Sequence, residues 1–288
     1  MGCLAFLTFC MVVGSCVLCS VCIVEGRHHR PHVLNHSQIK EKRLDTRKTV
    51  AYSRTSDPSI NTDWLQATAT WYGSPTGTGT DGGACGYGNL GTSFYGSHVS
   101  AGSPVLFKAG LGCGACYEVK CLVGGVCSSE AVTVSITDEC PGGYCSAGRA
   151  HFDMGGAAFG AMALSPSFTQ NLLNVGVVEV LYRRVPCSYA EGRTISFQVN
   201  EGATNYWFSI LIRNVGGDGD VAAVDLMERG QWRKMEHLWG AYWCLNAGPL
   251  EGPFSVRVTT SSGASLDAFN VIPANWVPGQ TYFSLVNF

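Results

Sequence analysis

Ile136-Thr-Asp-Glu-Cys-Pro-Gly-Gly-Tyr-Cys-Ser-Ala-Gly-Arg-Ala-His-Phe-Asp153 places two carboxylates, Asp138 and Asp153, on either side of a short loop that contains two cysteines. Asp138 follows the alternating apolar run of residues 131–137, so we expect it where a buried strand meets solvent. Asp153 precedes a run of small residues, 155–164, that is typical of a helix. Because strand ends and loops carry most functional groups, this stretch is the candidate site. The alternative is that both aspartates are turn and helix-cap residues.

An apolar leader opens the chain and predicts export. Residues 3–24 carry no charge, and we place a secretory signal peptide at residues 1–26. The run is also long enough to serve as an uncleaved anchor. Residues 27–61 follow as a basic extension, which holds eight of the 19 Lys and Arg residues and is expected to be disordered. It contains Asn35, the asparagine of an N-glycosylation sequon, and a histidine cluster that could instead bind metal.

The composition of the remaining chain bounds the class of protein. The whole chain has 288 residues, 46% hydrophobic and 14% charged, with 36 glycines, which favours a folded protein rich in strands and turns. From Thr55 onward there are 11 basic and 18 acidic residues, which argues against a nucleic-acid partner for the folded part. We expect no membrane span once the signal peptide is removed.

Fourteen cysteines divide unequally along the chain. Five lie in the leader, and eight of the other nine precede residue 190, which predicts a first half stapled by disulfides and a second half that relies on its own core. The Cys113-x-x-Cys116 spacing could also hold zinc, but export favours disulfides, and we expect no metal or other cofactor. The odd count leaves one thiol over, with Cys244 as the candidate.

The first half predicts a barrel of short strands. The expected β runs are residues 66–72, 104–107, 115–120, 131–137 and 175–184, with one helical patch at residues 157–164. A short segment with a proline and a glycine, residues 186–192, separates this half from the next. We therefore place the first domain at residues 62–192.

The second half, residues 193–288, predicts an antiparallel β-sandwich. Ile195, Phe197 and Val199 alternate with polar residues, and residues 254–258 show the same period of two. The acidic glycine-rich stretch at residues 216–220 has a faint likeness to a calcium loop, but a plain hairpin turn is the better interpretation.

Several motifs occur together and in a fixed order. They are Thr70-Trp-Tyr-Gly73, Thr80-Asp-Gly-Gly-Ala-Cys-Gly-Tyr87, Cys113-Gly-Ala-Cys116, Thr137-Asp138, His151-Phe-Asp153, Trp239-Gly-Ala-Tyr-Trp243 and Val271-Ile-Pro-Ala-Asn-Trp276. Over residues 62–288 the chain resembles the plant β-expansins. The resemblance implies an all-β, two-domain protein: a six-stranded double-psi β-barrel related to family 45 endoglucanases, then an immunoglobulin-like β-sandwich that binds carbohydrate. It also implies secretion to the cell wall and wall loosening at acid pH without hydrolysis.

The same resemblance implies a pairing of the cysteines. Cys85 would pair with Cys113, Cys116 with Cys187 and Cys121 with Cys127. Cys140 and Cys145 then remain, five residues apart, and we predict that they close the loop between the two aspartates. Two positions depart from the family pattern. Asp81 lies one position later than is usual, and Cys244 stands where relatives commonly carry arginine.

Hydrolysis of a glycan would need two carboxyl groups in different roles. An inverting enzyme uses a protonated acid and a second carboxylate, about 6.5–9.5 Å away, that activates water. Asp153 resembles the acid of the endoglucanase relatives, but the carboxylate expected after the motif at Thr70 is missing. Asp138 could replace it, or its charge could keep Asp153 protonated. We therefore predict that the protein is not an enzyme.

Binding to a polysaccharide would use aromatic platforms and hydroxyl-binding groups. The candidate platforms are Trp71, Tyr72, Trp207 and Trp239, and core packing is the alternative for each. Thr70, Tyr72, Asp81, Asp138 and Asp153 would hydrogen-bond sugar hydroxyls. His151 belongs to the same predicted set of polysaccharide-binding residues. We expect it to be a structural, hydrogen-bonded histidine and not a base; if it titrates, it would become charged in the acid range.

Together with the apolar leader, the resemblance implies a secreted, monomeric protein of the plant cell wall, with a loose association with a membrane left open. It would bind cell-wall polysaccharide, a xylan-type matrix glycan or cellulose, and loosen contacts between glycan chains. The alternatives are an endo-acting β-glycan hydrolase and a plain carbohydrate-binding or defence-type protein.

Overall fold

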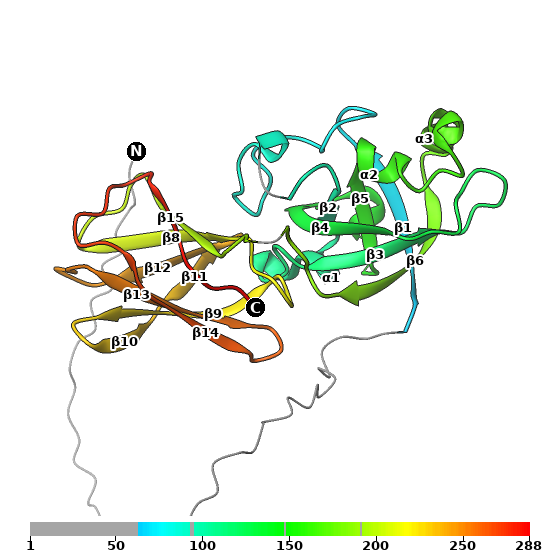
Figure 1. Cartoon of the computed structure of the whole chain (residues 1–288). Helices are drawn as coiled ribbons and strands as arrows, with labels where there is room; N and C mark the ends of the chain where they lie inside the picture. The colour runs from blue at the N-terminus through cyan, green and yellow to red at the C-terminus, as the bar shows by residue number, and fades with distance from the viewer. Residues whose placement is uncertain (1–62, 93–94, 147, 191) are drawn as a thin grey trace, which may run out of the picture. The chain divides into compact units, whose positions relative to one another are not determined.

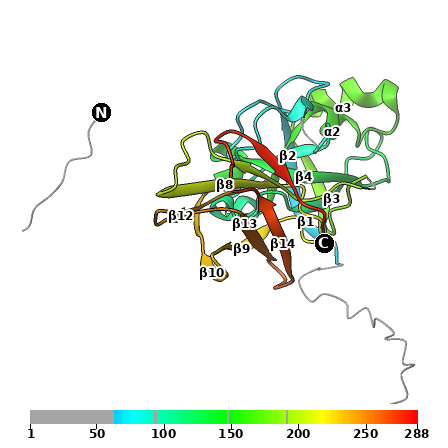
Figure 2. The same ribbon diagram turned by 60° about the vertical axis from the view of Figure 1, so that its left-hand side comes forward.

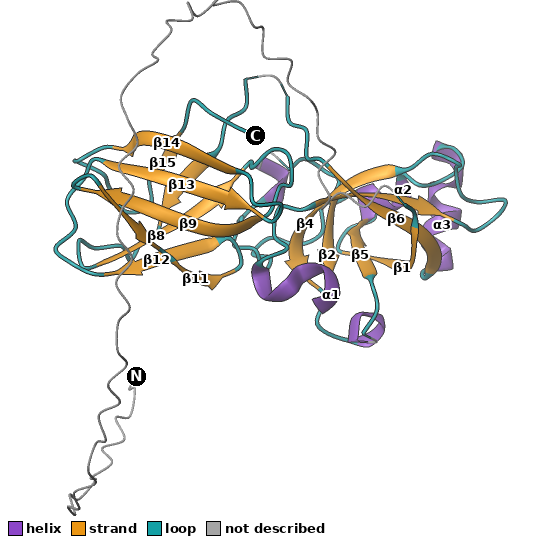
Figure 3. Cartoon of the chain, turned by 90° about the horizontal axis from the view of Figure 1, so that it is seen from below, coloured by secondary structure: helices purple, strands orange, loops and turns teal. Residues whose placement is uncertain are grey.

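The computed structural model describes residues 63–92, 95–146, 148–190 and 192–288 (Figure 1). The expected signal peptide, the basic extension and Asn35 lie outside these residues. The described residues all belong to one compact unit, and Figure 3 shows that strands make up most of its regular structure. Among the helices of the described ranges, none has the length and apolar character needed to cross a membrane.

Six strands of the first half close into a barrel in the order β1-β5-β2-β4-β3-β6. The strands are β1 (Leu65–Tyr72), β2 (Val99–Gly102), β3 (Cys116–Cys121), β4 (Val132–Glu139), β5 (His151–Gly155) and β6 (Val178–Val185). Phe152, Met154 and Ile136 are fully buried in the barrel core. The six-stranded barrel expected from the resemblance is confirmed, because β1 pairs with both β5 and β6 and so closes the sheet without an open edge.

Short helices join the barrel strands. They are α1 (Pro104–Phe107), α2 (Gly156–Gly160), α3 (Thr169–Val175) and the 3₁₀ helices η1 (Leu90–Thr92), η2 (Lys108–Gly110), η3 (Gly143–Ser146) and η4 (Pro166–Phe168). The expectation of a strand at residues 104–107 is wrong. Proline is favoured in the first turn of a helix, where its missing N–H costs nothing, and the turn buries Leu106 and Phe107 side by side.

The segment around Asp153 also differs from the expectation. His151–Gly155 forms strand β5, and the helix that follows covers only Gly156–Gly160. The residue that caps this helix is Gly155, without a side-chain hydrogen bond, so Asp153 is not a helix cap. Likewise the strand expected from residue 175 begins only at Val178, because residues 169–175 form α3.

Four disulfides staple the barrel: three are the pairs that the resemblance implied, and the fourth is the predicted pair of the two remaining cysteines. They are Cys85–Cys113, Cys116–Cys187, Cys121–Cys127 and Cys140–Cys145. Cys244 is a free, buried cysteine in the sandwich. The prediction that disulfides stabilise the first half and not the second is therefore confirmed for the described residues.

The second half is a sandwich of two sheets that lie face to face (Figure 1, Figure 2). One sheet has the order β10-β9-β13-β14 and the other β11-β12-β8-β7-β15. The strands are β7 (Ser196–Val199), β8 (Trp207–Arg213), β9 (Val221–Glu228), β10 (Gln231–Lys234), β11 (Glu236–Trp239), β12 (Tyr242–Asn246), β13 (Phe254–Thr260), β14 (Ser265–Ile272) and β15 (Thr281–Phe283). The alternating apolar residues expected to face inward, Ile195, Phe197 and Val199, are fully buried.

Residues 216–220 do not form the expected hairpin turn. They connect β8 to β9, which belong to different sheets, so the segment crosses from one layer to the other. Asp218 and Asp220 are buried there, and Asp220 forms an ion pair of 3.0 Å with Arg184 of β6. Within the described residues, no group of three or more His, Cys, Asp or Glu side chains could hold a metal ion.

Candidate glycan-binding site

A row of four residues crosses four neighbouring barrel strands and contains both aspartates. Thr70 of β1 pairs with Asp153 of β5, Asp153 pairs with Ala101 of β2, and Ala101 pairs with Asp138 of β4. Paired residues on adjacent strands project to the same face of a sheet. One strand therefore separates the two aspartates, with roughly 10 Å between their Cα atoms, and only the small side chain of Ala101 lies between them.

A β-bulge aims Asp138 at this face. The pairing of β2 with β4 shifts between Ser100, which pairs with Ile136, and Ala101, which pairs with Asp138. Ile136 is fully buried in the barrel core. In a regular strand, residues two apart share a face, so Asp138 would also point into the core. The extra residue, Thr137, instead brings Asp138 into the row with Asp153, as bulges near functional sites often do.

Asp153 is half-buried and held by Thr70, whose hydroxyl donates a hydrogen bond of 2.7 Å to Oδ1 of the carboxylate. Burial raises the pKa of Asp153 above its ordinary value. The hydrogen bond from Thr70 opposes this rise in pKa, and the negative charge of Asp138 adds to it. The repulsion between the aspartates is thus present, as the sequence suggested, but burial is the larger cause.

Asp138 anchors the loop that precedes β2. Its Oδ1 accepts hydrogen bonds from the backbone N–H of Ala84, at 2.6 Å, and of Glu139, at 2.8 Å. A side chain on Gly83 would come within 2.9 Å of Cγ of Asp138, so only glycine allows this close approach. Through Oδ1, Asp138 therefore acts as a turn residue, as in the alternative interpretation of the sequence. It also belongs to the row with Thr70 and Asp153.

His151 lies two residues before Asp153 on β5, on the same face and fully buried. Its Nδ1 lies 2.7 Å from Oγ1 of Thr68, and its Nε2 lies 2.8 Å from Oγ1 of Thr70. Thr70 has one hydroxyl hydrogen and donates it to Asp153, so its oxygen accepts the hydrogen of Nε2. The neutral imidazole therefore carries its hydrogen on Nε2, and Nδ1 accepts from Thr68.

The charge of His151 is suppressed at acid pH. Burial lowers the pKa of His151 to about 4, and the positive charge of Arg149 contributes. The side chain is a structural, hydrogen-bonded histidine, as expected. If His151 becomes charged, the lowered pKa places this charging near pH 4.

Tyr72 belongs to the same face as Thr70, two residues further along β1. Burial, followed by the charges of Asp138 and Asp153, raises the pKa of Tyr72 well above its ordinary value. The phenol therefore stays neutral beside the two carboxylates, but its hydroxyl group is buried against Gly79 and is not open to a sugar hydroxyl.

Trp71 lies on the opposite face of β1. Its indole N–H donates a hydrogen bond of 3.0 Å to the carbonyl of Leu173 in α3, and the ring packs against the barrel core. The structure therefore separates Trp71 from the aspartates. Asp81 is exposed, and its Oδ2 accepts a hydrogen bond from Asn89, whereas Trp207 lies beside Gly202 in the sandwich.

Trp239 is the aromatic candidate of the sandwich that lies against the loop held by Asp138. It is 46% exposed, and its ring lies 4.8 Å from that of Tyr242. A side chain on Gly86 would come within 2.9 Å of the Trp239 ring, and the N–H of Ala241 donates to the carbonyl of Cys85. Residues 83–86 thus connect the surroundings of Asp138 with those of Trp239. The backbone of this segment can extend over at most about 10 Å.

Tyr144 is an aromatic residue at the site that the sequence motifs do not single out. It lies in η3, inside the loop closed by Cys140 and Cys145, and is 52% exposed. Its ring stacks on that of His151, with 5.9 Å between ring centroids and 14° between ring planes. The signal in the sequence that could have identified Tyr144 is its position, between a glycine and a cysteine in the loop that joins the two aspartates.

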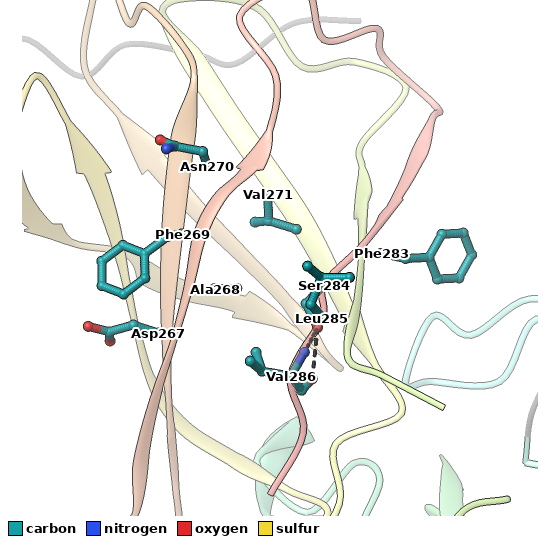
Figure 4. Close-up of a pocket in the computed structure, with 9 residues that line it drawn as sticks. All are labelled: Asp267, Ala268, Phe269, Asn270, Val271, Phe283, Ser284, Leu285 and Val286. Atoms are coloured by element: carbon teal, nitrogen blue, oxygen red, sulfur yellow. Dashed lines mark hydrogen bonds between the residues drawn. The ribbon is translucent and has the colours of Figure 1, made fainter. Parts of the chain in front are cut away.

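A separate cavity of about 400 Å³ lies on the sandwich, lined by residues 267–271 and 283–286 (Figure 4). Phe269 and Phe283 are both exposed there, but Figure 4 shows that they point to opposite sides. They do not form one flat face, so this cavity is not the candidate site.

Comparisons with known proteins agree with the fold, a barrel followed by a sandwich. A family model described as the expansin C-terminal domain matches residues 195–273, and one described as lytic transglycolase matches residues 99–182. The expansin of Clavibacter michiganensis, solved without ligand, has the same fold, with a TM-score of 0.59, 22% identity and coverage of 77% of this chain and 96% of that one. A closed six-stranded barrel followed by such a sandwich defines the expansin class of proteins.

Plant relatives narrow the class to a family. The chain is 51% identical over 249 residues to Expansin-B16 of Oryza sativa subsp. japonica, a match that covers 85% of this chain and 89% of the relative. It is 45% identical over 292 residues to Expansin-B11 of the same organism, covering 100% of this chain and 99% of the relative. The chain belongs to the expansin-B family.

Proposed function

We propose that this protein is a secreted plant cell-wall-loosening protein. It would bind a matrix polysaccharide or cellulose and disrupt non-covalent contacts between glycan chains at acid pH, without hydrolysing them. The observation that carries this proposal is the row formed by Thr70, Asp153, Ala101 and Asp138. It sets polar groups side by side on one face of the barrel, where they can replace the hydrogen bonds that glycan chains make with each other.

The two aspartates are suited to binding more than to hydrolysis. An inverting hydrolase needs a second carboxylate that is free to take a proton from water. Oδ1 of Asp138 already accepts two backbone hydrogen bonds that hold the loop at Ala84. Asp153, with its raised pKa, can donate a hydrogen bond at acid pH, when its carboxyl group is protonated. A surface that gains a donor as pH falls would bind sugar hydroxyls better in an acid wall.

Trp239 extends the proposed surface onto the sandwich. Its exposed ring offers a flat apolar face of the kind on which sugar rings stack. A mutant of the bacterial expansin was solved in complex with cellohexaose, which supports a β-linked glucan as one ligand of the shared fold. We propose a barrel domain at residues 62–192 and a carbohydrate-binding domain at residues 193–288, acting as a monomer in the cell wall. Trp71 is left out of the surface, because its indole is committed to Leu173.

The test combines two measurements on one preparation of purified protein. Clamped, heat-killed wall strips are held under constant load at about pH 5 while their extension is recorded, and released reducing sugar is measured in parallel. We expect extension without sugar release, and a strong loss of extension in Asp153→Asn. Catalytic release of sugar would identify the endo-acting hydrolase, and glycan binding without extension would identify a plain carbohydrate-binding protein. Either outcome rejects the proposal.

A further inference from the structure

The loop between the two aspartates holds an aromatic ring in a fixed position. Tyr144 lies one residue before Cys145, which is buried and bonded to Cys140. The disulfide closes a loop of few residues, so the backbone at Tyr144 has little freedom even though its side chain is 52% exposed. Side chains on short closed loops lose little further conformational entropy when a ligand binds.

The Tyr144 ring lies nearly parallel to the imidazole of His151 and is otherwise partly exposed. The angle between the two ring planes is 14°. His151 cannot rotate freely, because both of its ring nitrogens are hydrogen-bonded to threonines of β1. The fixed imidazole therefore constrains the orientation of the phenol ring that packs against it. Because the side chain is 52% exposed, the part of the ring that does not lie against the imidazole is accessible to a ligand.

This part of the ring adjoins the carboxylate row. His151 and Asp153 lie two residues apart on the same face of β5, about 7 Å from each other along the strand. A pyranose ring that stacks on Tyr144 through its C–H face would bring its hydroxyl groups toward Asp153 and Thr70. Combining one aromatic platform with adjacent polar groups is how proteins fix both the plane and the orientation of an amphipathic ligand.

We propose that Tyr144 is a stacking subsite that binds one pyranose ring of a β-linked glycan beside Asp153. This inference rests on the proposed function, and it adds a second aromatic platform, on the barrel, to that of Trp239. The competing explanation is that Tyr144 only covers His151. If Tyr144 only covers His151, a bulky aliphatic side chain such as leucine can replace it. If Tyr144 stacks on a sugar ring, leucine cannot replace it, because leucine has no flat face.

The experiment measures binding of two soluble probes, cellohexaose and the matching β-linked xylose hexasaccharide, by titration calorimetry with the wild type and three variants. Tyr144→Phe keeps the ring, Tyr144→Leu keeps an apolar cover without a flat face, and Phe269→Leu is the matched control on the sandwich. We expect Tyr144→Leu to raise Kd about 5- to 10-fold for at least one probe. We expect Tyr144→Phe and Phe269→Leu to stay within about twofold of the wild type.

A nuclear Overhauser measurement on the wild type removes the dependence on folded variants. Stacking requires contacts between the ring protons of Tyr144 and the C–H protons of one sugar unit, and their absence in a saturated complex overturns the subsite. Unchanged affinity in Tyr144→Leu overturns it as well, while leaving the proposed function intact. If the wild type binds neither probe, the subsite is rejected together with its ligand class, and the wall-extension measurement decides separately whether the proposed function stands.

Discussion

The hydroxyl group of Thr70 donates a hydrogen bond of 2.7 Å to Oδ1 of Asp153, which links the first barrel strand to a carboxylate on the fifth. The oxygen of the same hydroxyl lies 2.8 Å from Nε2 of His151. Since the imidazole donates to Thr70, the threonine hydrogen is directed at the carboxylate and stabilises its ionised form. A buried, neutral histidine thereby orients the hydroxyl group that lowers the pKa of Asp153, a residue to which the histidine has no hydrogen bond of its own.

Replacing Thr70 with valine removes the hydroxyl and keeps the shape of the side chain. We expect the pKa of Asp153 to rise further, because the hydrogen bond that opposes the effect of burial is lost. The pH at which wall extension becomes half-maximal should rise with it. The carboxyl resonance of Asp153, followed by NMR through a pH titration, measures the first effect directly.

The same substitution should also destabilise the fold, since Nε2–H of His151 loses its acceptor in a buried place. A cost of about 1–3 kcal/mol in the free energy of unfolding is expected. Thr133→Val, on an exposed position of β4, is the matched control and should change neither property. An unaltered Asp153 titration in Thr70→Val would contradict the role assigned to the hydroxyl.

His151 should remain neutral down to about pH 4, with its hydrogen on Nε2. Nitrogen chemical shifts of the imidazole distinguish the two neutral tautomers and give the pKa in the same titration. Removing the ring that covers it, in Tyr144→Ala, should let water in and move the pKa back toward the ordinary value of 6.5. A pKa near 6.5 in the wild type would show that the imidazole is not sealed.

The lowered pKa of His151 has a consequence for stability, whose direction follows from proton linkage. The unfolded chain takes up a proton on this histidine near pH 6.5, whereas the folded protein does so only near pH 4. The contribution of His151 to the free energy of unfolding therefore falls as the pH drops from about 6.5 to about 4. Asp153 acts in the opposite direction, because its pKa is raised on folding. The difference in unfolding free energy between the wild type and His151→Gln, measured across this range, isolates the histidine term.

The alternation of apolar residues predicts two of the four strands that carry the row of Thr70, Asp153, Ala101 and Asp138, but not the other two. Residues 131–137 and 66–72 alternate clearly, and both form strands close to the expected limits. Residues 99–102 and 151–155 were not predicted as strands, because they are short, small or polar and become strands only through pairing inside the closed barrel. Local propensity carries no information about such pairing.

The sequence indicates individual residues of the candidate site but not how they are arranged in space. Asp138, Asp153 and Thr70 were singled out from motifs, yet nothing in the order of residues 136–138 indicates the bulge that aims Asp138 at the row. Trp71 and Tyr72 are adjacent, and the sequence gives no ground for deciding which faces the aspartates. The hydrogen bond between Trp71 and Leu173, 102 residues apart, decides it.

Asp138→Asn separates the charge of this residue from its role in holding the loop. An asparagine oxygen can still accept from the N–H groups of Ala84 and Glu139, so the fold should lose less than about 1 kcal/mol. The pKa of Asp153 should fall, because the negative charge that raises it is gone. Asp138→Ala removes the acceptor as well and should release residues 83–86, which faster amide hydrogen exchange at Ala84 would report. Equal exchange in the two variants would contradict the anchoring role.

Two tryptophans that resemble each other in the motifs should respond in opposite ways to the same substitution. Trp239→Leu removes an exposed ring beside Gly86, and we expect binding of cellohexaose to weaken about tenfold with little change in stability. Trp71→Leu removes a ring packed on the barrel core and its hydrogen bond to Leu173, so we expect a loss of roughly 2–4 kcal/mol in unfolding free energy. Its affinity for cellohexaose should stay unchanged under conditions where the variant remains folded. Calorimetric titration and chemical denaturation of both variants check the pair, and weaker binding by folded Trp71→Leu would return this residue to the glycan-binding surface.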